Sequence, residues 1–109
     1  MCAALAVLAG LFVYWDNTAL LAASFSPALP DLPQGFDGCR VVVLGDLHST
    51  YFGEDNEKLL EAVGAQEPEY IFLVGDLLDA FRDVPEGYAK ETAAGLTAIA
   101  PTYYVTGNH

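Results

Sequence analysis

Three short clusters of acidic, imidazole and amide side chains each follow directly on an apolar run. The clusters are Asp46-Leu47-His48, Gly75-Asp76-Leu77-Leu78-Asp79 and Gly107-Asn108-His109. Carboxylate, imidazole and amide ligands together suit Mn, Fe or Zn better than Cu(I) or calcium. One Asp-x-His pair would be a weak signal, but three ordered clusters of this kind indicate a site for divalent metal ions.

The apolar runs before the clusters predict three β-strands, over residues 40–45, 70–74 and 102–106. The middle run is unbroken and rich in β-branched and aromatic residues, which is typical of a strand buried on both faces of a parallel sheet. Successive clusters lie about 30 residues apart, the length of a strand, a crossover helix and a return strand. Right-handed crossovers would bring all three clusters to one edge of one sheet.

Two crossover helices are expected between these strands. The first would begin with Asp55 or Asn56 as its N-cap and end before Pro68, and the second would cover residues 88–100. Their sheet-facing stripes are Leu59, Leu60 and Val63 in the first helix, and Tyr88, Thr92, Leu96 and Ile99 in the second.

The N-terminal part has a different character. Residues 1–15 carry no charge, and a helix over them would be about 22 Å long, against roughly 30 Å for a bilayer core. We expect an uncleaved apolar anchor, with a short signal-like segment as the alternative, and no basic flank sets its orientation. Residues 16–39 are interpreted as a linker with a possible edge strand at 20–25 and no regular structure from 26 onward, and residues 40–109 as the catalytic domain.

The charge balance limits the possible partners. The formal net charge is −11, and the only cations are Arg40, Lys58, Arg82 and Lys90, so the chain offers no basic surface for nucleic acid. A phosphorylated substrate would be repelled unless bound divalent cations reversed the local charge. The two cysteines form no recognisable disulfide or zinc pattern.

The three clusters resemble the motifs in the N-terminal half of the calcineurin-like metallophosphoesterase superfamily, over about residues 38–109. The apolar lead-in and residues 32–48 are further similar to small, membrane-associated bacterial members. The resemblance implies an α/β fold, the βαβαβ half of an αββα sandwich. It also implies hydrolysis of a phosphomonoester, a phosphodiester or a lipid or nucleotide pyrophosphate by metal-bound hydroxide at a dinuclear metal centre.

The resemblance assigns ligands to two metal ions. It implies that Asp46 and His48 bind the first ion, that Asp76 bridges both, and that Asn108 binds the second through its amide oxygen. A bridging carboxylate also makes physical sense, because two cations about 3.5 to 4 Å apart repel each other strongly.

By the same resemblance, His109 is the catalytic histidine, which protonates the leaving oxygen or stabilises phosphoryl charge, and Asp79 is its carboxylate partner. Asp79 could instead cap a turn after its strand. Family members supply further histidine ligands after these motifs, so we expect a longer parent chain, bacterial and membrane-anchored, with its catalytic domain outside the cytoplasm. The alternative is an inactive, membrane-tethered α/β module that binds at most one divalent ion.

Overall fold

The computed structural model describes residues 2–81 and 83–108. In chain order its elements are α1 (Cys2–Thr18), η1 (Gln34–Phe36), β1 (Val41–Leu44), η2 (Glu54–Asn56), α2 (Glu57–Gly64), β2 (Tyr70–Val74), α3 (Tyr88–Ile99) and β3 (Thr102–Val105). The strands form one parallel sheet in the order β1-β2-β3. The mixed α/β class and the alternation of strands and helices after residue 40 are as the sequence predicts.

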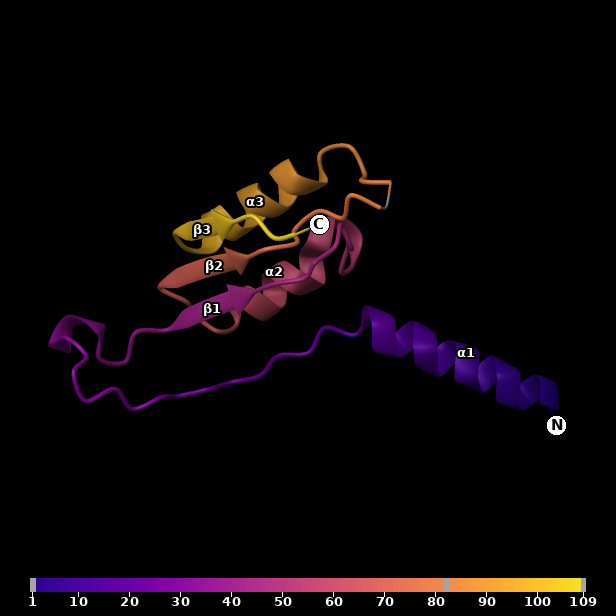
Figure 1. Ribbon diagram of the computed structural model, residues 1–109, viewed down its shortest axis with the longest axis horizontal. Helices are drawn as coiled ribbons and strands as arrows, with labels where there is room; N and C mark the ends of the chain where they lie inside the picture. The colour runs from indigo at the N-terminus through magenta and orange to yellow at the C-terminus, as the bar shows by residue number, and fades with distance from the viewer. Residues whose placement is uncertain (1, 82, 109) are drawn as a thin grey trace.

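Both crossover helices, α2 and α3, cover the same face of the sheet (Figure 1). The reason is topological: β1, β2 and β3 are neighbours in sequence order, and each right-handed crossover that steps in the same direction returns over the same face. The resulting architecture is two layers, with the apolar core between the helices and the sheet.

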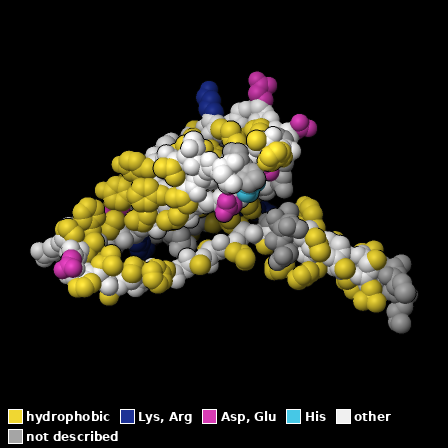
Figure 2. Space-filling view, viewed as in Figure 1, with side chains coloured by type: hydrophobic (Ala, Val, Ile, Leu, Met, Phe, Trp, Pro, Cys, Tyr) yellow, Lys and Arg dark blue, Asp and Glu magenta, His cyan; other side chains and the backbone are white. Residues whose placement is uncertain are grey.

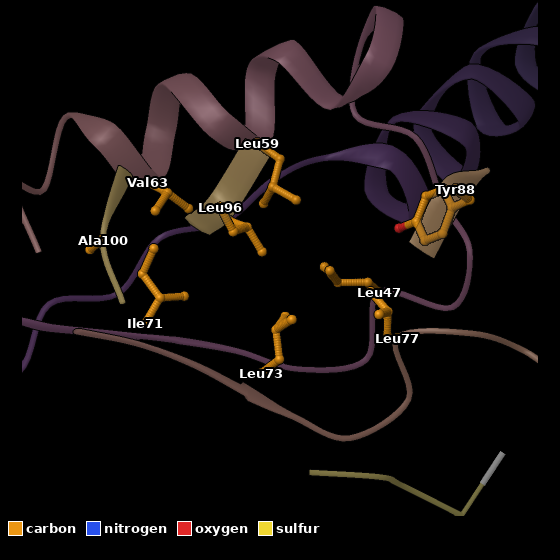
Figure 3. Packing of buried hydrophobic residues seen from close by; sticks show 9 residues of the cluster. All are labelled: Leu47, Leu59, Val63, Ile71, Leu73, Leu77, Tyr88, Leu96 and Ala100. Atoms are coloured by element: carbon orange, nitrogen blue, oxygen red, sulfur yellow. The ribbon is translucent and has the colours of Figure 1, made fainter. Parts of the chain in front are cut away.

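The core contains side chains from both layers and from two loops (Figure 3). Leu59 and Leu96 from the helices pack with Ile71 from the central strand, and all three are fully buried. Leu47 and Leu77 are also buried in this cluster, although each lies in a loop that follows a strand. These two leucines anchor their loops to the core, and the same loops carry the clusters of acidic and histidine residues.

The other face of the sheet is uncovered by the residues that the structure describes. Its exposed apolar side chains, which form much of the hydrophobic surface in Figure 2, are Val41, Val43, Phe72, Val74, Tyr103 and Val105. The expectation that the central strand is buried on both faces is therefore wrong for this chain, since both crossover helices lie on one side. An uninterrupted apolar run predicts the strand but does not say on which face the helices pack.

The second crossover helix is confirmed: α3 spans Tyr88–Ile99, and Tyr88, Thr92 and Leu96 are its buried residues. The first ends at Gly64, before Pro68 as expected, and is preceded by Asn56 at the N-cap position.

The cap itself is not as expected, because the Asn56 side chain makes no capping hydrogen bond. The backbone of Asn56 is left-handed, with φ 63°, whereas a capping residue normally has an extended backbone that aims its side chain at the first turn. Its fully buried amide instead accepts a hydrogen bond from the Phe52 N–H and donates one to Thr92 Oγ1, each at 2.9 Å.

The N-terminal region differs from its expected boundaries. α1 continues to Thr18 rather than ending near residue 15, and residues 19–29, all described, contain no strand where an edge strand was considered. Leu20 packs against the core cluster instead, while Leu21 and Phe25 are 84% and 86% exposed. One turn of 3-10 helix, η1, interrupts the linker that was expected to be irregular. Within residues 2–81 and 83–108, no helix is both long enough and apolar enough to cross a membrane.

Candidate metal centre

The residues of the three clusters that the structure describes lie at one edge of the sheet. Asp46 and His48 follow β1, Asp76 and Asp79 follow β2, and Asn108 follows β3. Because the strands are parallel, their carboxyl ends share that edge, and the loops that leave it carry the polar groups. His109 lies outside the described residues.

Three of the predicted ligands are close enough to share an ion. One ligand atom from each of Asp46, His48 and Asp76 lies within 4.8 Å of the other two. Ligands at about 2.0 to 2.2 Å from one ion are about 3 to 4.4 Å apart, so a small rotation of the side chains would complete the geometry. The Asp46 side chain is 80% exposed and free of tight packing, which permits such a rotation. Two carboxylates and an imidazole therefore fit a divalent metal ion.

His48 presents its two ring nitrogens to different carboxylates. Nε2 lies 3.9 Å from Asp46 Oδ1, on the side of the other ligands, and Nδ1 lies 3.7 Å from Asp79 Oδ2. A metal-ligating histidine commonly directs its second nitrogen at a carboxylate, which fixes the tautomer and the orientation of the ring. The structure thus places Asp79 behind His48, a neighbour that the sequence analysis did not assign to it.

Asp79 also closes a turn with its other oxygen. Its Oδ1 accepts a hydrogen bond from the Phe81 N–H at 2.9 Å, which is the turn-capping role considered for this residue. One carboxylate thus both caps the turn and faces the His48 ring. The Asp79 side chain is only 12% exposed, so the loop around it sets the orientation of the carboxylate.

The loops after β1 and β2 are joined by their backbones. The His48 N–H donates to the Asp76 carbonyl at 2.9 Å, and the Ser49 N–H donates to the Leu77 carbonyl at 3.0 Å. The Ser49 hydroxyl accepts a hydrogen bond from the Asp79 N–H at 3.1 Å. Ser49 therefore helps to position Asp79, a role that the sequence analysis missed because nothing in the Asp-x-His pattern marks the following residue.

Several site residues have a left-handed backbone, with φ 54° at Asp46, 47° at His48, 58° at Ser49 and 46° at Asp76. This conformation costs a non-glycine residue about 1 to 2 kcal/mol. Such strain persists only where the surrounding structure determines it, and here the two loops hold each other by hydrogen bonds. With this backbone, ligand atoms of Asp46, His48 and Asp76 approach one another to within 4.8 Å.

Two tyrosines support the loop that follows His48. The Tyr88 hydroxyl donates to the Thr50 carbonyl at 3.0 Å, and the Tyr51 hydroxyl donates to Glu91 at 2.9 Å. The two rings pack edge to face, with centroids 4.8 Å apart. Burial raises the pKa of the Tyr88 hydroxyl, and partial desolvation together with the Glu91 carboxylate raises the pKa of the Tyr51 hydroxyl, so both remain neutral donors at ordinary pH.

Comparison with known proteins agrees with the motif analysis. Residues 39–109 match the model of the calcineurin-like phosphoesterase family. No curated protein and no solved structure matches the chain. The family match includes all three strand ends and every predicted metal ligand.

Proposed function

Because the chain belongs to the calcineurin-like phosphoesterase family, we propose that it hydrolyses a phosphoester with divalent metal ions bound at the carboxyl edge of its sheet. The observation that carries this proposal is the convergence of Asp46, His48 and Asp76, whose ligand atoms lie within 4.8 Å of one another. The oxygen and nitrogen donors favour Mn, Fe or Zn.

The proposed centre holds two ions. Asp46 and His48 hold the first, Asn108 at the end of β3 holds the second, and Asp76 at the end of the central strand lies between them. Divalent ions at such a site lower the pKa of water and neutralise phosphoryl charge. In a chain of net charge −11, that neutralisation also allows an anionic substrate to approach.

The remaining residues orient groups and move protons. Asp79 faces His48 Nδ1 at 3.7 Å and thereby orients the ring so that Nε2 is directed at the ion. His109, next to Asn108, protonates the leaving oxygen or stabilises the phosphoryl oxygens. A carboxylate near His109, with Asp79 as the candidate, would keep its imidazolium available near neutral pH.

We propose phosphomonoesters, phosphodiesters and lipid or nucleotide pyrophosphates as the substrate classes. The apolar helix α1 attaches the chain to a membrane, with the site outside the cytoplasm. This part of the proposal is supported by the exposure of the α1 side chains, among them Leu8, Phe12 and Trp15, and by the absence of a charge within residues 1–15. Attachment to a membrane would favour a lipid-linked substrate.

Metal binding and turnover test the proposal together. We expect the full chain to bind Mn(II) and to hydrolyse an aryl phosphomonoester or phosphodiester, and we expect Asp76→Ala to abolish both activities. Asp31→Ala is the matched control, because Asp31 is an exposed carboxylate in the linker, remote from the strand ends. A chain that binds no metal and turns over neither substrate would contradict the proposal.

A further inference from the structure

Asp76 and Gly107 lie against each other where β2 and β3 end. Asp76 is 8% exposed, and its carboxylate fills the space beside the Gly107 backbone that a side chain would take. A Cβ added at Gly107 would overlap Asp76 Oδ1 and would lie 2.5 Å from the Asp76 backbone nitrogen. Any side chain at position 107 therefore competes with the carboxylate for the same space.

The backbone conformation of Gly107 does not by itself require glycine. Its φ is outside the left-handed range that the structure has at Gly75, where φ is 89°. Gly75 contributes in another way, because a Cβ there would lie 3.0 Å from the Gly107 Cα, so the two chain segments approach closely. At position 107 the requirement is for space alone.

We infer that Gly107 is a positioning residue for the metal centre, whose missing side chain forms the cradle of the Asp76 carboxylate. The inference rests on the proposed function, since Gly107 acts through a proposed ligand. A new side chain would meet both the Asp76 carboxylate and, at 2.5 Å, the Asp76 backbone nitrogen, while the Asp76 carbonyl is held by the His48 N–H at 2.9 Å. The carboxylate is the part of Asp76 that can rotate, so it would leave its place beside Asp46 and His48, and a small backbone shift would relieve the remaining contact.

Titration of the full chain with Mn(II) by calorimetry tests this inference. Gly107→Ala is expected to lower the affinity about 10- to 100-fold, the range for residues that orient a ligand. Gly45→Ala is the matched control at the end of β1, because a Cβ there would make only an ordinary 3.4 Å contact with Val74 Cγ2. Equal affinities for Gly107→Ala and the native chain, or equal losses in both variants, would overturn the inference.

Urea unfolding without metal separates this inference from the proposed function. Gly107→Ala should lower the unfolding midpoint in the native background and lower it less in an Asp76→Ala background, where the carboxylate is gone. If Gly107→Ala alone fails to fold, recovery of folding in the double variant supports the inference and its failure to recover opposes it. Absence of Mn(II) binding by the native chain would overturn the proposed function, and the urea comparison would then decide only whether Gly107 makes room for the Asp76 carboxylate.

Discussion

Replacing Asp79 by asparagine is expected to weaken metal binding while leaving the fold intact. The side chain keeps its shape, and its carbonyl oxygen can still accept the hydrogen bond from the Phe81 N–H. What is lost is the negative charge that faces His48 Nδ1 at 3.7 Å. A hydrogen bond to a charged acceptor contributes about 1.5 to 3 kcal/mol. Since 3.7 Å is longer than a hydrogen bond, we expect about 1.4 to 2 kcal/mol, or about a 10- to 30-fold loss of affinity.

Calorimetric titration with Mn(II) or Zn(II) measures that loss directly. Asp83→Asn is the control, because Asp83 is an exposed carboxylate in the same loop and undergoes the same chemical change. Circular dichroism should show that both variants keep the native helix and sheet content. If Asp79→Asn binds metal within about threefold of the native chain, the reasoning that Asp79 orients His48 is refuted.

Three further predictions concern the fold, its pH dependence and the N-terminal segment. Asn56→Ala should lower the free energy of unfolding by about 2 to 4 kcal/mol more than Asp55→Ala in urea denaturation, since both residues have a left-handed backbone and the fully buried Asn56 amide makes one buried and one part-buried hydrogen bond. Burial raises the pKa of Tyr88 above its ordinary value, so the stability it contributes should be complete below about pH 10 and should fall as pH rises through the raised pKa. The free energy of unfolding of Tyr88→Phe should decline less than that of the native chain in this alkaline range. An identical decline in both proteins would oppose the assignment to Tyr88. Removal of residues 1–18 should abolish co-sedimentation with neutral phosphatidylcholine vesicles, because residues 5–15 carry exposed apolar side chains, and unchanged co-sedimentation would oppose membrane attachment through α1.

The sequence was sufficient to predict the strands and the edge at which their clusters meet. Each strand is a local apolar run, and the length between runs, about 30 residues, determines a crossover. Parallel pairing then follows from chain topology rather than from any particular contact. The meeting of Asp46, His48 and Asp76 is a consequence of those local signals, which is why it could be predicted without coordinates.

Features that depend on side chains remote in sequence could not be predicted in the same way. Asn56 has the residue type and position of a helix cap, but its amide bonds to Phe52 and to Thr92, 36 residues away. Asp79 faces His48 only because the two loops pair through their backbones. In both cases the sequence identifies a polar group, while tertiary packing decides its partner.

The left-handed residues of the metal centre place the site in conflict with the stability of the chain that holds it. Glycine would relieve the backbone at Asp46 or Asp76, with a net gain of roughly 0.5 to 1 kcal/mol after its greater freedom in the unfolded chain is counted. It would also remove one of two carboxylates that repel each other when no cation lies between them. Selection for heat resistance in the absence of metal would therefore erode the site. The same selection with metal present would preserve the site, because ligand binding stabilises only the folded chain.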